Sequence, residues 1–233
     1  MTNAIAKTNG TALAVHDLDP FEAYANAVSP RSIVGELLKF SKGDFIAGED
    51  GRDIKAGTVF TANLDELMAG YIKWENAKPV EHRMVRVADG VTPPTRSTLG
   101  DTDESKWEKD DRGEPRDPWQ FTNYLPLMST EGDLFTFVTS SRGGIGAVGQ
   151  LARTYARHRR NSPNVHPLIT LDVGSYEHSN KAFGKIKFPQ FNPVGWELKE
   201  GFNKALTAAG YSVAEPPPAE KDPADEMSDD IPF

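Results

Sequence analysis

The sequence contains no cysteine, so neither a disulfide bond nor a thiolate metal site can form. Its five histidines, at positions 16, 82, 158, 166 and 178, show no metal-binding spacing. No apolar run is long enough to span a membrane, and residues 1–15 hold one lysine and no apolar stretch typical of a signal peptide. We therefore expect a cytoplasmic protein that holds neither a metal nor a cofactor.

The sequence also lacks a motif that marks a catalytic nucleophile. The acid pairs Asp65-Glu66 and Asp103-Glu104 have the character of turn or loop charges rather than of paired catalytic carboxylates. A Ser-His-Asp arrangement brought together by folding stays open, but no residue pattern favours it. We therefore expect that the protein is not an enzyme.

One long segment lacks acidic residues altogether. Between Leu134 and Leu171 there is no Asp or Glu, although the chain holds 34 acids, and five arginines lie there. Cations without acidic neighbours suit phosphate binding, and interleaved aromatic rings offer surfaces on which bases stack. The predicted DNA-binding residues are Tyr71, Lys73, Trp119, Phe121, Tyr124, Phe135, Arg142, Arg153, Arg157, Arg159, Arg160, Lys181, Phe183, Lys185 and Lys187.

Two structural alternatives stand beside this interpretation. About half of the aromatic rings are expected in a core, Phe137 and Trp74 above all, because aromatic side chains dominate protein interiors. Arg153, Arg157 and Arg160 follow helical spacing, which a solvated helix face also shows. The missing acidic partners favour the binding interpretation for the arginines.

Composition divides the chain into three parts. Residues 1–18 are small and polar and predict a flexible N-terminus, residues 19–212 predict one domain, and residues 213–233 predict a disordered acidic tail. Inside the domain, the polar segment 89–117 predicts an insertion loop, and a loop this long is usually functional or mobile.

Apolar patterning and turn residues place the elements of the domain. Helices are expected over 19–28, 145–160 and 198–209, the last one capped by Gly210. Residues 64–73 predict a helical turn followed by a strand. The remaining expected strands are 36–45, 58–63, 84–87, 119–128, 134–140, 165–174 and 183–188, with Pro189 ending the last one.

The order of these elements predicts a mainly β, α+β fold. Strands precede a central helix and two further strands follow it, which is compatible with an OB-fold-like five-stranded barrel carrying insertions and a short C-terminal helix. Such a barrel binds single-stranded nucleic acid on one sheet face and its loops. The insertion at 89–117 leaves the register of the first three strands open.

The tail accounts for most of the charge of the chain. From Glu215 to Asp230 it holds seven acids and one lysine, a net charge of −6 against −8 for the whole chain. The remaining residues are therefore close to −2, so the low isoelectric point does not argue against nucleic-acid binding by the domain.

The sequence ends in Asp229, Asp230, Ile231, Pro232 and Phe233, two acids before an apolar end. An apolar ring beside a terminal carboxylate fits a pocket with basic residues at its rim. This end resembles the acidic tip of bacterial single-stranded-DNA-binding proteins, and the rest of the chain looks like a divergent, phage-type version. The resemblance implies a protein of a bacterial or phage-infected cell that binds single-stranded DNA in replication, recombination or repair. It also implies that these five residues bind the partner enzymes.

Two alternative functions remain open from the sequence. A strand-annealing recombination protein could carry the same tip. The segment from Gly144 to Gly149 matches G-x-G-x-x-G and opens a predicted helix, with Asp172 at the end of the next strand, which is typical of a dinucleotide-dependent βαβ enzyme. A glycine-rich turn that binds DNA phosphates uses the same amide chemistry. Gln150 stands where a Walker A loop needs lysine.

Overall fold

The computed structural model describes residues 33–110, 113–181 and 184–211. The predicted helix at 19–28, the stacking candidate Phe183 and the tail with its five terminal residues lie outside the described residues.

The described part of the chain is mainly β, which confirms the predicted α+β class. Its strands are β1 (Glu36–Ser41), β2 (Asp44–Ala47), β3 (Arg52–Ile54), β4 (Val59–Ala62), β5 (Met68–Glu75), β6 (Lys78–Arg86), β7 (Trp119–Ser129), β8 (Leu134–Thr139), β9 (Val165–Glu177) and β10 (Lys185–Leu198). Its helices are α2 (Arg142–His158), α3 (Lys199–Ala208) and the 3-10 turns η1 (Leu64–Glu66), η2 (Val87–Asp89), η3 (Arg96–Thr98) and η4 (Glu104–Lys106). No helix in these residues is long and apolar enough to cross a membrane.

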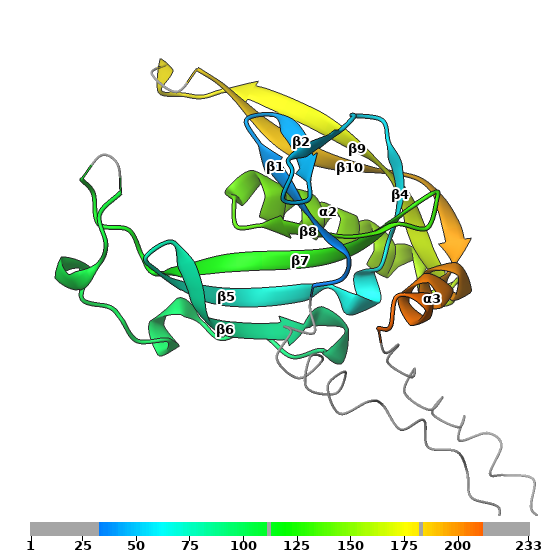
Figure 1. Cartoon of the computed structure of the whole chain (residues 1–233), viewed down its shortest axis with the longest axis horizontal. Helices are drawn as coiled ribbons and strands as arrows, with labels where there is room; N and C mark the ends of the chain where they lie inside the picture. Colours follow the sequence, from blue (N-terminus) through cyan, green and yellow to red (C-terminus); the bar gives the residue numbers. More distant parts are fainter. Residues whose placement is uncertain (1–32, 111–112, 182–183, 212–233) are drawn as a thin grey trace, which may run out of the picture. The chain divides into compact units, whose positions relative to one another are not determined.

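All ten described strands belong to one curled, open sheet, which is consistent with a barrel-like α+β fold (Figure 1). β7 is its centre, because it pairs with β8 on one side and with both β4 and β5 on the other. β4 continues the sheet to β9 and β10, whereas β5 continues it to β6. β8 continues it to β1 through a parallel pairing, followed by β2 and β3.

The sheet curls around one main core. The inward side chains of β7 and β8, Leu125, Leu127, Phe135 and Phe137, pack with the buried stripe of α2. That stripe consists of Val148, Leu151 and Tyr155, at the helical spacing the sequence predicted. α2 therefore fixes which face of the sheet is interior.

A smaller core covers the opposite side of the sheet. Phe202 and Leu206 of α3 pack against Val34, Met128 and Leu134. The predicted cap is confirmed, since Gly210 follows α3 with φ +81 and its N–H donates to the carbonyl of Thr207.

Residues 36–45 form a hairpin rather than the single predicted strand. Lys42 and Gly43 both have positive φ, +54 and +106, so the chain reverses between β1 and β2. The side chain of Lys187 lies against this turn, where a Cβ atom on Gly43 would come 2.1 Å from its Cδ. The hairpin therefore reaches across the curl of the sheet to β10.

β9 and β10 are longer than predicted, and Pro189 does not end the second strand. β10 runs on to Leu198, with Pro189 opposite Val173 and an irregularity between Pro193 and Gly195. Proline is tolerated here because β10 is an edge strand that pairs only with β9.

Candidate nucleic-acid interface

Two aromatic rings lie on the interior face of the sheet beyond the end of its core. Tyr71 of β5 is directly opposite Phe121 of β7, and their ring centroids are 5.2 Å apart in an edge-on arrangement. Phe121 alternates with Leu125 and Leu127 and so shares the core-facing side of β7. Both rings are partly exposed, which leaves apolar surface for a ligand.

The N-terminus of α2 meets the sheet beside this pair. Asn123 is the next inward residue after Phe121 and lies opposite Thr139 of β8. A Cβ atom on Gly144 would come 2.0 Å from the Thr139 hydroxyl oxygen, and one on Gly143 would come 2.8 Å from Cβ of Phe188. These glycines therefore let the helix backbone pack directly between β8 and β10.

The hairpin of β9 and β10 carries a second pair of rings, on the face opposite to its core-facing side chains Val173 and Phe191. The Phe188 ring is 6.1 Å from the ring of Tyr176, which is 51% exposed and 6.5 Å from His178. We call Tyr71, Phe121, Phe188 and Tyr176 the aromatic strip. It consists of two ring pairs, and the start of α2 lies beside both, since Gly143 packs on Phe188 while Gly144 packs on Thr139, which is opposite Asn123.

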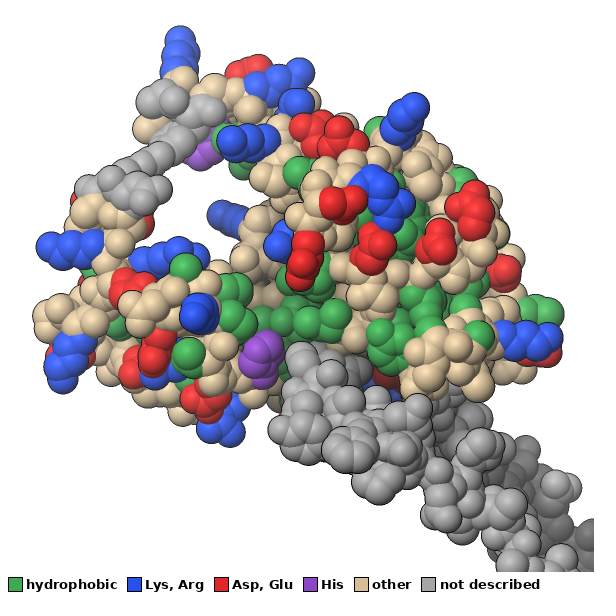
Figure 2. Space-filling view, viewed as in Figure 1, with side chains coloured by type: hydrophobic (Ala, Val, Ile, Leu, Met, Phe, Trp, Pro, Cys, Tyr) green, Lys and Arg blue, Asp and Glu red, His purple; other side chains and the backbone are tan. Residues whose placement is uncertain are grey.

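The space-filling view shows a deep opening on this side of the described chain (Figure 2). It lies between the tip of the β9–β10 hairpin and the part formed by β5, β6 and the segment 90–117, as comparison with Figure 1 shows. Lys and Arg side chains gather along its border.

Several cations near the aromatic strip have no acidic partner among the residues that the structure describes. Arg142 follows the cap of α2, Lys42 forms the β1–β2 turn, and the others belong to β10 or to the turn before it. The cations that form no ion pair with any described residue at this place are Lys42, Arg142, Lys181, Lys185 and Lys187. This end of the domain therefore has positive charge that is free to meet phosphates.

The other predicted arginines lie farther along α2. Arg153 and Arg157 are exposed on the face opposite the buried stripe, and Arg160 follows the helix, all three without an ion pair to a described residue. Arg159 differs, because it lies 5.5 Å over the Tyr155 ring and 3.8 Å from Asp65.

Lys73 is not a free cation, contrary to its predicted role. Its ammonium lies 3.0 Å from Glu75 and 3.1 Å from Asp101. The Trp119 indole also donates to Asp101, and these two contacts, the indole first, hold the pKa of the Asp101 carboxyl below its usual range. The charge of Lys73 is therefore largely neutralised where it stands.

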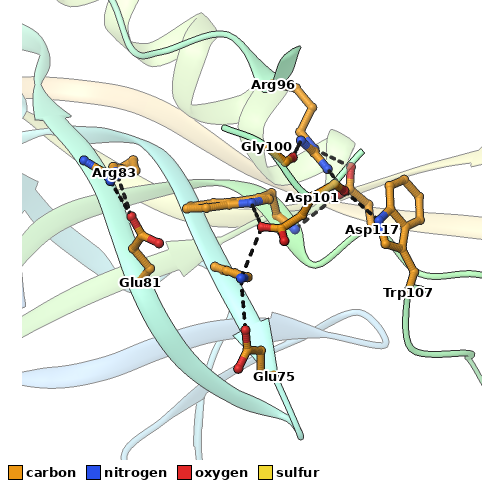
Figure 3. A network of polar contacts seen from close by, with 10 residues as sticks. Glu75, Glu81, Arg83, Arg96, Gly100, Asp101, Trp107 and Asp117 are labelled. Carbon is orange, nitrogen blue, oxygen red and sulfur yellow. Dashed lines mark hydrogen bonds and ion pairs between the residues drawn. The ribbon is translucent and has the colours of Figure 1, made fainter. Parts of the chain in front are cut away.

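The segment 90–117 is anchored to the sheet through the same aspartate. Arg96 donates to Asp117 at 2.7 Å and to the carbonyl of Gly100, and its guanidinium lies 5.8 Å over the Trp107 ring (Figure 3). The Trp107 indole donates to the carbonyl of Asp101 at 2.7 Å. Trp107 therefore packs inside the segment, while Asp101 joins the segment to Lys73 and Trp119 of the sheet.

Three predicted stacking residues are enclosed in the structure. Trp119, Tyr124 and Phe135 are 4%, 4% and 2% exposed. Burial raises the pKa of Tyr124 to about 12, and Phe135 packs edge-on against Phe60 in the main core. No ring face remains for a base, so we do not retain them as stacking residues.

The sequence reasoning missed four residues of this site: Lys42, Asn123, Tyr176 and Phe188. Phe188 is opposite Gly174, and Tyr176 is opposite Ile186. The two rings are therefore diagonal neighbours only because β9 and β10 pair in the observed register. Lys42 was assigned to a strand interior, although Lys-Gly is a turn signal that could have placed it. Asn123 carried no sequence signal.

The glycine segment does not form a dinucleotide fold in the described chain. β8 and β9, which flank α2, are not neighbours, because β8 pairs with β7 and β1 whereas β9 pairs with β4 and β10. Gly144, Gly146 and Gly149 all lie inside α2 rather than in a turn before it.

A second polar cluster lies where η1, α2 and α3 meet. Asp65 accepts from Tyr155 at 2.9 Å and lies 2.5 Å from the ammonium of Lys199, while His166 is 1% exposed beside Tyr155 and Phe202. Burial lowers the pKa of His166 to about 4. No group of side chains in the described residues could hold a metal ion.

Comparison of the chain with known protein families, with curated proteins and with solved structures gives no match, so the interface is interpreted from its own geometry.

Proposed function

We propose that the protein binds single-stranded DNA without strong sequence preference, as a non-enzymatic protein of replication, recombination or repair. The observation that carries the proposal is the aromatic strip, bordered by cations that have no acidic partner among the described residues. Bases stack on rings whatever their identity, and phosphates bind free cations, so this combination suits a single strand better than a duplex.

The strand connections support an OB-like organisation of the domain. β4 and β5 act as one bent first strand, since both pair with β7 and only η1 separates them. β7 and β8 follow as the second and third strands, α2 as the helix, and β9 and β10 as the last two. β1, β2 and β3 are additions next to β8.

The position of the strip fits this organisation. OB folds bind oligonucleotides on their second and third strands and on the loops that follow the first and fourth strands. Here those parts are β7, the region from β6 to residue 117, and the β9–β10 connection, and the opening in Figure 2 lies between the two loops. The proposed path of the strand runs through this opening, over Phe121 and Tyr71 and past Arg142.

The C-terminal residues supply the second half of the proposal. Their resemblance to the tip of bacterial single-stranded-DNA-binding proteins supports recruitment of partner enzymes by Asp229, Asp230, Ile231, Pro232 and Phe233. No structural observation favours the strand-annealing alternative over simple binding, and the arrangement of α2 does not support the dinucleotide alternative.

The test is a titration of the purified protein with single-stranded and duplex oligonucleotides of the same sequence over a series of salt concentrations. We expect tighter binding to the single strand and an affinity that falls steeply with salt. Equal affinity for both forms, or an affinity independent of salt, would contradict the proposal.

Single substitutions refine the test. Arg142→Ala should weaken binding to every sequence and reduce the salt slope by about one, as the loss of one phosphate contact does. Arg153→Ala is the matched control on the same helix, about 16 Å away by helix rise, and should leave short oligonucleotides unaffected. If Arg142→Ala and Arg153→Ala lost the same affinity, the DNA strand would instead be assigned to the exposed face of α2.

A further inference from the structure

Asn123 is a buried amide with no hydrogen-bond partner at the edge of the aromatic strip. Its side chain is 7% exposed, its carbonyl oxygen is enclosed without a partner, and no hydrogen bond joins the side chain to any described residue. Buried polar side chains are nearly always paired, so such a group needs an explanation.

The surroundings of Asn123 differ from those of the other two such groups in the described chain. His166 lies inside the cluster of Tyr155 and Phe202, and Trp74 borders a small cavity of about 170 Å³ beside Pro118. Only Asn123 follows directly after a ring of the aromatic strip on the same face of the same strand.

The register places the amide next to the ring pair. Asn123 lies between Ala69 of β5 and Thr139 of β8, two residues after Phe121, which is opposite Tyr71. Ala69 has a small side chain, and the Thr139 hydroxyl is engaged with Ser141 at 3.2 Å. A planar ligand lying on Phe121 would therefore have Asn123 as its neighbour on the same face of β7, and neither Ala69 nor Thr139 forms a hydrogen bond with the Asn123 amide.

We propose that Asn123 hydrogen-bonds the edge of a nucleobase stacked on Phe121, beside Tyr71. This inference rests on the proposed function and assigns a base-contacting residue within it. A carboxamide presents one donor and one acceptor side by side, and it can turn over to exchange them. Every base offers an adjacent donor and acceptor on its pairing edge, so one Asn satisfies all four and keeps binding tolerant of sequence.

The chemistry predicts how a carboxylate would change this tolerance. Asn123→Asp keeps the shape but replaces the donor by a second acceptor. Guanine offers two adjacent donors on its pairing edge, whereas thymine and cytosine each pair one donor with an acceptor. The Asp variant should therefore favour guanine. The added charge also repels the phosphates of every strand alike, so this general effect cancels when the affinities for different oligonucleotides are compared.

The experiment measures affinity of the full chain for oligonucleotides of dT alone, of alternating dG and dT, and of alternating dC and dT. Wild type should bind the three similarly. Asn123→Asp should shift the ratio toward the dG-containing strand by about tenfold, the value of one charge-assisted hydrogen bond. Asn123→Leu should weaken all three about three- to tenfold and unfold at no lower denaturant concentration, because it removes an unpaired buried amide.

Three results would overturn the inference. If both Asn123 variants bind all three strands as wild type does, while Phe121→Ala loses affinity, Asn123 is only structural and the proposed function stands. If Asn123→Leu loses affinity only in proportion to a loss of folded protein, the amide supports the sheet. If wild type binds none of the strands, the proposed function itself fails.

Discussion

At the scale of single residues, His166 is the clearest case of an environment that sets a chemical state. It is enclosed by Tyr155 and Phe202, with the Asp65 carboxylate and the Lys199 ammonium nearby. Burial disfavours the imidazolium and outweighs the attraction of Asp65, so the pKa falls to about 4 and the ring stays neutral near pH 7. His166 therefore links the stability of this cluster to pH.

We expect the free energy of unfolding to fall as the pH drops from 6.5 to about 4. In this range the unfolded chain binds a proton at His166 and the folded chain does not, so the stability present above pH 6.5 is lost on acidification. The lowered pKa corresponds to about 3 kcal/mol. Denaturant unfolding at a series of pH values measures this loss.

His166→Gln should flatten this pH dependence, because an amide does not titrate. His82→Gln, at an exposed position on β6, is the matched control and should behave as wild type. An equally steep loss in His166→Gln would show that other groups control acid unfolding.

The paired rings of β5 and β7 permit a second prediction at this scale. Tyr71→Ala or Phe121→Ala should each cost about 1–3 kcal/mol of single-strand binding, the usual value of one stacked base. Fluorescence titration measures the loss. Trp196→Ala is the control, since this partly buried ring stacks on His158 at 3.5 Å, away from the aromatic strip. If Trp196→Ala lost as much affinity as Phe121→Ala, the assignment of Tyr71 and Phe121 as stacking residues would be contradicted.

At the scale of elements, α2 combines a packing role with the placement of Arg142. Its first turn is capped by Ser141, whose hydroxyl accepts from the amide of Gly144 at 3.1 Å. Gly143 and Gly144 let this turn touch Phe188 and Thr139, which sets where the arginine projects. Gly143 and Gly144 thus serve the close packing of α2 against β8 and β10.

Two glycines of α2 should respond to alanine in opposite directions. Gly144→Ala should destabilise the protein by about 1–3 kcal/mol, because its Cβ would come 2.0 Å from the Thr139 oxygen. Gly146→Ala has nothing within 4 Å and should stabilise it by about 0.5–1 kcal/mol through helix propensity. The denaturant midpoints of the two variants measure these changes in stability. If Gly144→Ala and Gly146→Ala had equal effects, the close approach of α2 to β8 would be contradicted.

At the scale of the whole molecule, charge is divided between the domain and its tail. The tail from Glu215 to Asp230 carries −6, and the cations around the aromatic strip have no described acidic partner. Because an acidic segment tethered to a basic surface has a high local concentration there, we expect it to compete with DNA for the proposed interface when no partner binds the tail.

Deletion of Phe233 should reduce capture of partner enzymes to background, because it removes the ring and moves the terminal carboxylate. Binding of single-stranded DNA should stay unchanged or rise slightly at low salt. A pull-down from host lysate beside a DNA titration measures both. Loss of DNA binding with unchanged capture would assign the tail to the DNA site instead.

Local patterns were sufficient for much of this chain. The acid-free arginine segment, the helix carrying Val148, Leu151 and Tyr155, and the Gly210 cap follow from spacing and residue type, which act over a few neighbouring residues. The tertiary structure decided which rings are free. Phe121 and Tyr124 are three residues apart on β7 and face opposite sides of the sheet, and Tyr124 is covered whereas Phe121 stays partly exposed.

Pairing across long sequence distances decided the rest. The ion pair of Lys73 with Asp101, the contact of Lys187 with Gly43 and the position of Phe188 at the start of α2 each join distant segments. Such contacts depend on sheet register and on the curl that brings β10 to the β1–β2 turn, and neither is encoded in any local pattern of side chains. Some residues of the proposed interface, such as Phe121 and Arg142, are therefore evident in the sequence, whereas Phe188 and Tyr176, and the place of all of them beside one opening, are decided by the fold.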